Sequence, residues 1–395
     1  MKSALDNIKV LDLTRVLAGP YATMLLADLG ADVIKIEMPK IGDDSRGYGP
    51  YLNNESAYFM SINRNKKSMT LNLKNKSGKT IFLELVKEAD VLVENFRPGT
   101  MEKLGLGYDY LITLNPKLIY ASASGYGHTG PYSQRAAYDA VVQAMGGIMS
   151  ITGEKDGKPT RVGSSIGDIS AGMFTAVGIL AALVNRNLTG NGQMVDVAML
   201  DCQVAMLENA IARYYVTGKV PRPYGNRHTS IVPFEAFETS DGEIMVAAGN
   251  NALWERLCNT LGCRVLINDK RFKENADRNE NYDDLRPLLA PHFLTKTTKK
   301  WQDILDKEGI PNGPINTIDK VVEDLQVLAR DMIVEVQHPI AGSFKMPGIP
   351  IKLSETPGSI RTPSPTLGQH TNEILKEHLG LDDIDIEELA KEGAI

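Results

Sequence analysis

Short apolar stretches alternate with amphipathic stretches through the first half of the chain, and this alternation predicts strands followed by helices. The runs expected to form strands lie at residues 7–13, 32–37, 69–73, 90–93, 118–121 and 193–198. Helical periodicity follows the first run as far as Leu29 and returns at residues 77–89. Strands that alternate with helices form parallel sheets covered on both faces. We therefore expect an α/β domain with a Rossmann-like parallel sheet.

Residues 171–184 form a strongly apolar stretch in which Thr175 is the sole polar side chain. A helix without a polar stripe is expected to be buried around most of its circumference. Gly167 and Asp168 precede this stretch. The simplest interpretation makes Asp168 the helix N-cap. The alternative makes it a nucleophile, because the helix dipole favours an ionised carboxylate and Gly167 lets a ligand approach closely.

The second half of the chain changes character after the predicted strands of the sheet. We expect a long helix at residues 201–215 and a Gly-, Pro- and Arg-rich crossing at residues 218–228. Two strands around a turn at 240–242, helices and a charged surface segment at 269–284 follow. The predicted helices lie at residues 252–261, 283–294 and 298–307, and two strands and two terminal helices come after them.

These shifts divide the chain into two domains and the segments that connect them. Residues 1–200 are expected to form the large α/β domain, which residues 330–395 complete. A linker helix and crossing occupy residues 201–223, a smaller α+β domain covers residues 224–320, and residues 321–395 return to the large domain.

Composition narrows the function classes. The 395 residues are 43% hydrophobic, and the net charge is −6 without a basic block, so neither nucleic acid nor a membrane is an expected partner. No leader pattern and no apolar run of 18 residues occurs, which predicts a cytoplasmic protein. The three cysteines and six histidines lack metal-ligand spacing, so no metal site is expected.

Two groups of residues invite a phosphate-binding interpretation. Residues 125–130 match G-x-G-x-x-G after a predicted strand, but Pro131 follows directly and Asp139 comes sooner than the roughly 20 residues that ribose binding needs. NAD binding is therefore not expected, and the segment is interpreted as a Gly-rich loop. Residues 63–67 and Arg46 carry charges that could hold phosphates, although such charges more often lie on a solvated surface.

Several short motifs follow one another along almost the whole chain. They are Leu-Asp-Leu-Thr-Arg-Val-Leu-Ala-Gly-Pro at 11–20, Asp-Leu-Gly-Ala-Asp-Val-Ile-Lys-Ile-Glu at 28–37, Asn-Phe-Arg-Pro-Gly at 95–99, Ser-Gly-Tyr-Gly at 124–127 and Gly-Asp at 167–168. In sequence and order they resemble the class III CoA-transferases, the family of formyl-CoA transferase and carnitine CoA-transferase. Segments at 230–233, 248–251, 313–316 and 367–370 are similar to the branch that uses succinate and hydroxymethylglutarate.

The resemblance implies the class III CoA-transferase fold, an interlocked homodimer and Asp168 as the nucleophile. The reaction would transfer CoA from an acyl-CoA, such as succinyl-CoA, to a carboxylic acid, with a dicarboxylate expected. It would pass through mixed anhydrides and an aspartyl-CoA thioester, with no tightly bound cofactor. Arg15, Arg46 and Arg135 are candidates for holding the distal carboxylate. Backbone N–H groups near Gly167 or at 249–251 are candidates for stabilising the oxyanion.

The resemblance also implies the residues that contact CoA and the acids. Met38 and Lys103 stand where formyl-CoA transferase has arginines that contact CoA, so those contacts are expected to differ here. The expected CoA contacts are Leu17, Ala18, Leu71, Asn72, Leu73, Lys74, Asn95, Phe96, Arg97, Lys103, Ala123, Ser124, Gly125 and Tyr126. The expected substrate contacts are Tyr138 and the loop Gly249, Asn250 and Asn251, which matches the family's mobile substrate loop.

Two alternatives remain open. The α-methylacyl-CoA racemases share this fold and pair the aspartate with an earlier histidine, because racemisation needs two acid/base groups. Tyr138 occupies that histidine's place here, and tyrosine is a weak base at neutral pH, although His128 keeps the alternative open. The second alternative is a noncatalytic CoA-binding protein, and the intact Gly167-Asp168 pair argues against it.

Overall fold

A computed structural model describes residues 3–395 of the chain. The chain divides into two compact units, which we describe separately. Unit 1 comprises Met1–Met149, Arg161–Lys219 and Gln326–Ile395, and unit 2 comprises Ser150–Thr160 and Val220–Leu325. Residues 150–160 therefore belong with unit 2, although their neighbours on both sides along the chain lie in unit 1.

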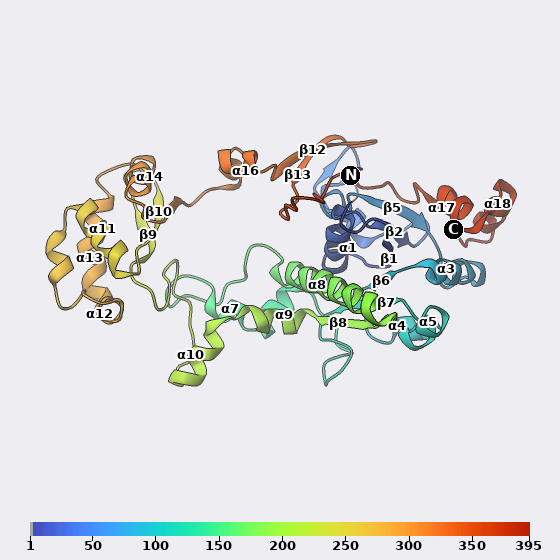
Figure 1. Cartoon of the computed structure of the whole chain (residues 1–395), viewed down its shortest axis with the longest axis horizontal. Coiled ribbons are helices and arrows are strands. Elements are labelled where there is room, and N and C mark those ends of the chain that lie inside the picture. Colours follow the sequence, from blue (N-terminus) through green and yellow to red (C-terminus); the bar gives the residue numbers. More distant parts are fainter. Residues whose placement is uncertain (1–2) are drawn as a thin grey trace. The chain divides into compact units, whose positions relative to one another are not determined.

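A six-stranded sheet forms the centre of unit 1, and all of its strand pairs are parallel (Figure 1). Its order is β5-β2-β1-β6-β7-β8, which is the doubly wound order in which the chain starts in the middle and winds outward in both directions. The direction of winding reverses between β1 and β6. The strands are β1 Lys9–Asp12, β2 Asp32–Glu37, β5 Lys66–Thr70, β6 Val91–Glu94, β7 Ile119–Ser124 and β8 Met194–Ala198.

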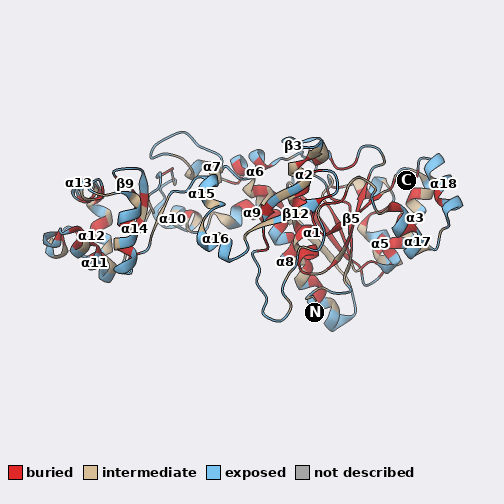
Figure 2. Ribbon diagram, turned by 90° about the horizontal axis from the view of Figure 1, so that it is seen from above, coloured by how far each residue is buried: buried red, intermediate tan, exposed pale blue. Residues whose placement is uncertain are grey.

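Alternate residues of the strands face two separate hydrophobic clusters, as expected for a sheet covered on both sides. On one face, Val10 and Val91 pack in a cluster with residues of α1 (Ala18–Asp28) and α8 (Ile166–Thr189). On the other face, Leu11 and Leu92 pack with α3 (Lys76–Glu88), α5 (Tyr108–Leu114) and α17 (Thr371–Leu379). In Figure 2 the central strands are red, whereas α18 (Asp383–Lys391) is largely pale blue. The predicted parallel α/β sheet is confirmed.

The C-terminal segment packs onto the first half of unit 1. The buried Arg64 guanidinium pairs with Asp28 at 2.8 Å and also donates to the carbonyl of Pro347, the last residue of β13 (Gly342–Pro347). Farther on, the His370 ring accepts from the Ser68 backbone N–H in β5 at 3.1 Å. The remaining elements of unit 1 are η1 Asp44–Gly47, β3 Tyr51–Leu52, β4 Glu55–Ser56, α2 Ala57–Ile62, α4 Thr100–Lys103, α6 Asp139–Met145, α9 Met199–Met206, α10 Asn209–Thr217, β12 Ile333–His338 and β13 Gly342–Pro347.

Helix α8 departs from the prediction that it is buried around most of its circumference. Its inner side packs against α1 and the sheet, but Val177 and Val184 are 61% and 62% exposed, and Met173, Phe174 and Leu188 are exposed with them. These five side chains recur at helical spacing, and we call them the α8 stripe. By length and composition α8 could also cross a membrane, but half of its most apolar window is buried, as in the core helix of a globular domain.

The single helix predicted at residues 201–215 is wrong. The structure has two helices, α9 and α10, separated at Leu207 and Glu208. Glu208 adopts a φ of +53°, in the left-handed region that a continuing helix does not allow. The apolar periodicity runs through this break, which is why the pattern does not reveal it.

Unit 2 has an antiparallel sheet, β11-β10-β9, whose buried side chains pack in one cluster with those of α11, α13 and α14. Phe272 and Arg278 are fully buried in this unit, so the predicted charged surface segment at 269–284 is wrong in part. The element bounds are β9 Phe234–Glu238, β10 Glu243–Ala247, α11 Asn251–Leu261, η2 Arg264–Asn268, α12 Asn275–Glu280, α13 Tyr282–Phe293, α14 Thr298–Lys307, β11 Asn312–Pro314 and α15 Ile318–Val321. Two short helices, α7 Ile148–Ile151 and α16 Leu325–Ala329, have residues in both units.

Candidate active site

Two neighbouring cavities lie beyond the carboxyl ends of the strands of unit 1, at the point where the winding of the sheet reverses. Such points are where open α/β sheets bind ligands. One cavity, of about 450 Å³, is lined by residues that follow β1, β2, β5 and β6, and we call it the apolar cavity. The other, of about 290 Å³, contains Asp168 and is called the Asp168 cavity. Arg15 and Phe96 line both, so the two cavities adjoin.

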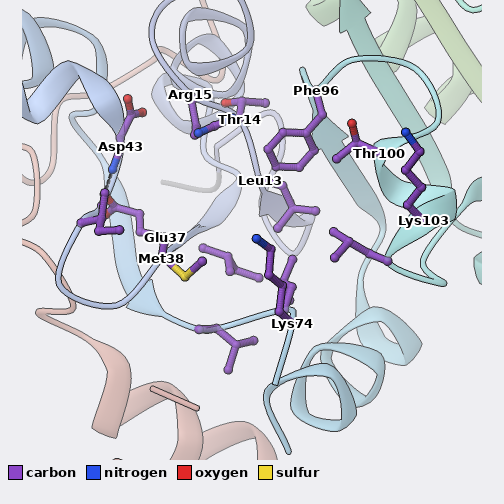
Figure 3. Close-up of a pocket in the computed structure, with 16 residues that line it drawn as sticks. Leu13, Thr14, Arg15, Glu37, Met38, Asp43, Lys74, Phe96, Thr100 and Lys103 are labelled. Carbon is purple, nitrogen blue, oxygen red and sulfur yellow. Dashed lines mark hydrogen bonds between the residues drawn. The ribbon is translucent and has the colours of Figure 1, made fainter. Parts of the chain in front are cut away.

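The apolar cavity combines aliphatic walls with two lysines at its rim. Leu13 lies beside the Phe96 ring, and Lys74 and Lys103 extend from the segments after β5 and β6 (Figure 3). The predicted CoA contacts among its lining residues are Leu71, Leu73, Lys74, Phe96 and Lys103, and Met38 also lines it. An apolar slot with cations at its edge suits a flat ring that carries phosphates.

The Asp168 cavity brings together the second group of predicted site residues. Those that line it are Leu17, Ala18, Asn95, Phe96, Arg97, Ala123, Ser124, Gly125, Tyr138 and Asp168. Two predicted CoA contacts line neither cavity. Asn72 is used structurally, since it donates to the Gly393 carbonyl and accepts from the Lys74 N–H. Tyr126 is buried, and its hydroxyl contacts the Met145 sulfur.

Asp168 is the third residue of α8 and not its N-cap, so that prediction is wrong. Ser165 occupies the N-cap position, and it makes no side-chain capping bond. Within residues 3–395, no hydrogen bond or ion pair engages the Asp168 carboxylate. The side chain is half-buried and borders the cavity. Its carboxylate is therefore available to a ligand.

The capping role belongs to Asp139, at the start of α6. Its Oδ1 accepts the Gly167 N–H at 2.8 Å, and its Oδ2 accepts from the Gln143 side chain at 2.8 Å. Gly167 permits this approach, because a Cβ there would lie 2.8 Å from Val142 and 3.0 Å from Asp139 Oδ1. Asp139 thus holds the first turn of α8 from outside the helix. The same bond occupies the Gly167 N–H, so among the backbone N–H groups expected near Gly167 to stabilise the oxyanion this one is already used.

Burial and the neighbouring Asp139 carboxylate raise the pKa of Asp168 to about 7. Burial removes water from the charged form, and a second negative charge nearby disfavours it further. These two effects act against the helix dipole, which was expected to favour the ionised form of Asp168. Near neutral pH the carboxyl is present about equally as acid and as carboxylate.

The loop after β1, which lines both cavities, rests on a buried set of charges. Asp12 accepts the Thr14 N–H at 2.9 Å and pairs with Lys66 at 3.0 Å. Lys35 donates to the Thr14 carbonyl at 2.7 Å and pairs with Asp43 at 2.8 Å. The lysines hold the pKa of Asp12 below its usual value despite burial, which keeps this carboxylate charged. The loop backbone is thereby fixed before any ligand arrives.

The basic residues at 63–67 and Arg46 are mostly structural rather than exposed or phosphate-binding. Lys66 is fully buried against Asp12, and Arg64 is buried against Asp28. Arg46 donates to both carboxylate oxygens of Glu37 at 2.7 Å and stacks on the Phe59 ring. Arg46 is therefore occupied and lines neither cavity.

The loop after β6 is tied to the loop after β1. Asn95 accepts the Arg15 N–H at 2.8 Å and donates to the Arg15 carbonyl at 2.7 Å. Glu94 accepts the Phe96 N–H at 2.7 Å. Burial raises the pKa of Glu94 to about 7. Sequence reasoning found the Asn-Phe-Arg motif but missed Glu94, which orients it.

His128 does not supply a second acid/base group to Asp168. Its Nε2 lies 2.7 Å from the Ser122 hydroxyl and 3.8 Å from Glu94, and the residue lines a different surface cavity. Tyr138, in the place of the racemase histidine, is 72% exposed and lines the Asp168 cavity. The arrangement of a racemase is absent among the residues that line this cavity.

The predicted substrate loop lies in unit 2, beside a cavity of about 660 Å³. Asn250 caps α11 by accepting the Leu253 N–H at 2.8 Å. The buried Arg278 donates to the Gly249 carbonyl at 2.9 Å and to the Asn251 side chain at 3.2 Å. The loop is therefore held by its own unit. Across the described part of the chain, no cluster of three His, Cys, Asp or Glu residues suits a metal ion.

The doubly wound sheet, with the Asp168 carboxyl group and two adjoining cavities where its winding reverses, is typical of an α/β enzyme. Comparison with known proteins identifies its family, because the model of CoA-transferase family III matches residues 5–371. Succinyl-CoA:glutarate CoA-transferase of Mus musculus is 44% identical over 392 residues, which are 99% of this chain and 90% of the mouse protein. Acetyl-CoA:oxalate CoA-transferase of Acetobacter aceti is 45% identical over 354 residues, 89% of this chain and 90% of that protein.

A solved structure, that of a CAIB/BAIF family protein from Brucella suis, is 39% identical with a TM-score of 0.85. The aligned region covers 96% of this chain and 100% of the Brucella suis chain. The chain belongs to CoA-transferase family III and is a CoA-transferase, whose substrates include a CoA thioester. This confirms the family, the enzyme class and the thioester substrate that the motifs indicate.

Proposed function

We propose that the enzyme transfers CoA from succinyl-CoA to a dicarboxylate such as glutarate, with Asp168 as the nucleophile. The observation that carries this proposal is the position of Asp168, whose carboxylate is free and borders the cavity that adjoins the apolar cavity. The related mouse enzyme is named for succinyl-CoA and glutarate, and the Acetobacter enzyme for another diacid, oxalate.

In the proposed reaction the Asp168 carboxylate attacks the thioester carbonyl and releases CoA thiolate, which leaves a mixed anhydride. The thiolate attacks the Asp168 carbonyl, so that succinate leaves and an aspartyl-CoA thioester remains. The acceptor carboxylate attacks this thioester, which forms a second anhydride and releases the thiolate again. The thiolate then attacks the acceptor's acyl carbon, and Asp168 returns as carboxylate. Each step exchanges a thioester for an anhydride or the reverse, and over the whole cycle one thioester replaces another, so no other reactant is consumed.

CoA would extend from the apolar cavity to Asp168. Its adenine and phosphates would lie between the apolar walls and the two lysines, Lys74 and Lys103. The pantetheine would pass Phe96 and Arg15, which line both cavities, and would reach the thioester position beside Gly125. A Cβ on Gly125 would lie 2.3 Å from Ala137, so glycine keeps this wall close-packed.

A transfer assay tests the proposal. The purified enzyme is incubated with succinyl-CoA and glutarate, and glutaryl-CoA is measured by liquid chromatography and mass spectrometry. We expect glutaryl-CoA with wild-type protein and at least about 1,000-fold slower formation with Asp168→Asn. The absence of acyl-CoA exchange with any carboxylic acid, in a folded sample, would refute the proposed function.

We further propose that the chain forms the interlocked homodimer expected for its family, in a reducing, cytoplasmic compartment. The α8 stripe supports the homodimer, because apolar side chains at helical spacing on a long helix favour burial against a partner. Three free, buried cysteines suit the compartment. Light scattering should give twice the 43.2 kDa chain mass. The double variant Val177→Glu, Val184→Glu should lower that mass, and a wild-type monomer would contradict the proposal.

A further inference from the structure

The Asp168 cavity contains three arginines, and their partners differ. A diacid that presents one carboxylate to Asp168 must place its other carboxylate inside or at the edge of the same small cavity. A carboxylate removed from water is costly unless a cation pairs with it. The arginines that line the cavity are Arg15, Arg97 and Arg135. The question is which of them is free to bind the distal carboxylate.

Arg15 already has a carboxylate partner. Its guanidinium lies 3.2 Å from Asp44 and stacks over the Phe96 ring at 5.3 Å, at the junction of the two cavities. Arg97 directly follows Phe96, which lines both cavities, but Arg97 itself lines only the Asp168 cavity. Arg15 is therefore held at the junction of the cavities, along the path of the extended ligand, and Arg97 is the next residue after Phe96 on that path.

Arg135 is positioned differently. No carboxylate pairs with its guanidinium in the part of the chain that the structure describes, and it instead lies over the Tyr132 ring at 4.6 Å and near the Tyr126 ring at 5.8 Å. Its backbone closes a turn with Tyr132 at 2.8 Å. Stacking of this kind restricts an arginine side chain while leaving its N–H groups available for a planar anion.

The chain connects Arg135 directly to the reacting group. Residues 135–138 line the Asp168 cavity without interruption, and the next residue, Asp139, holds the first turn of the helix that carries Asp168. The close approach of Ala137 to Gly125 packs this segment against the opposite wall. Arg135 and Asp139, which holds the helix that carries the nucleophile, thus belong to one continuous segment at the Asp168 cavity.

From this arrangement we infer that Arg135 binds the distal carboxylate of the diacid and is the specificity-determining residue for dicarboxylic acids. This inference rests on the proposed CoA transfer and adds the residue that selects its substrate class. A guanidinium offers two parallel N–H groups to a carboxylate, whereas a methyl group at the same place gains nothing from it. The enzyme therefore prefers glutarate to pentanoate, which has the same chain length but lacks the distal carboxylate.

Acceptor selectivity tests this role. We compare kcat/KM for glutarate and for pentanoate with succinyl-CoA as donor, in wild type, Arg135→Gln and Arg135→Lys. Loss of a charge-assisted bond is worth roughly 10- to 100-fold. We expect Arg135→Gln to lower kcat/KM for glutarate by that factor and to leave pentanoate unchanged. Arg135→Lys keeps the positive charge but cannot donate two parallel hydrogen bonds. Its kcat/KM for glutarate should therefore lie between those of wild type and Arg135→Gln.

Two further variants separate the possible causes. Arg330→Gln removes the same charge from an exposed site outside both cavities and should leave both acceptors unchanged. Arg97→Gln, on the path of CoA, should lower kcat/KM equally for both acceptors. Equal preference of the wild type for the two acids, or an equal loss for both acids in Arg135→Gln, would overturn the inference while transfer itself persists. A wild type without any transfer would instead refute the proposed function.

Discussion

Asp139 and Asp168 are neighbouring carboxylates, but they differ in their hydrogen bonding. Asp139 accepts hydrogen bonds from Gly167 and Gln143, and its charge is used to hold a helix. Asp168 accepts none within the described chain, and its pKa is raised to about 7. Hydrogen-bond donors thus decide which carboxylate is structural. The one without donors keeps its reactivity because nothing else uses its lone pairs.

The largest effect is expected from removing the free carboxylate. In Asp168→Asn the shape of the side chain is kept, but an amide cannot attack a thioester as a carboxylate does. We expect transfer to fall by about 1,000-fold or more, within the range typical of a lost nucleophile. Steady-state assays at pH 8 measure this loss, and an unchanged circular dichroism spectrum controls for folding. Activity within tenfold of wild type would mean that Asp168 is not the nucleophile.

The next effect should come from removing the hydrogen bonds of Asp139. Asp139→Ala leaves the Gly167 N–H without its acceptor and frees the first turn of α8. Small displacements of a reacting group cost up to about 100-fold in rate. We expect kcat at pH 8 to fall by about 10- to 100-fold. A value equal to wild type would show that this bond does not position Asp168.

The matched variant Asp139→Asn separates charge from hydrogen bonding. Its side-chain oxygen still accepts from Gly167, but the negative charge beside Asp168 is gone, so the pKa of Asp168 should fall. In wild type, kcat/KM should decline about tenfold per pH unit below a midpoint near 7, as Asp168 becomes protonated. In Asp139→Asn this midpoint should shift to lower pH by about one unit. Superimposable profiles for the two proteins would contradict the coupling between the carboxylates.

The smallest effect concerns stability. The pKa of Asp168 in the folded protein, about 7, is above its value near 3.9 in the unfolded chain. Ionisation of Asp168 therefore destabilises the folded state, and the free energy of unfolding falls as the pH rises from about 4 to 7. Asp168→Asn removes that cost. We expect its free energy of unfolding to exceed that of wild type by about 1–3 kcal/mol at pH 8, with no gain at pH 4. Urea denaturation at both pH values measures the difference, and an equal gain at both would refute its electrostatic origin.

The pattern of the sequence predicts the sheet well and the charged interior poorly. Most strands of the parallel sheet are short apolar runs that the local pattern places, but β5 (Lys66–Thr70) contains two lysines and begins three residues before the predicted run at 69–73. The motif at 95–99 follows one of the apolar strands. The burial of Lys66 depends on Asp12, 54 residues earlier, and no local pattern reveals such a pairing. Lys66 therefore resembles an exposed charge until the fold brings the two together.

The same limit explains the errors around Asp168. An Asp before an apolar helix normally caps it, but here the capping acid comes from α6, 28 residues earlier. The error about the α8 stripe has a related cause. An apolar helix face indicates that the face is buried, but the sequence does not reveal whether the same chain or a partner buries it. Asp168 itself was found because its motif is local. Asp139 was missed as a functional residue because its partner is distant in sequence.

Detection of CoA on Asp168 tests the central claim most directly. The enzyme is incubated with succinyl-CoA without acceptor, quenched in acid, digested and analysed by tandem mass spectrometry, with Asp168→Asn as the control. We predict a peptide that carries CoA as a thioester at Asp168, which disappears when glutarate is added before quenching. CoA attached at another residue, or glutaryl-CoA formation by a wild-type enzyme that never carries CoA, would contradict the account.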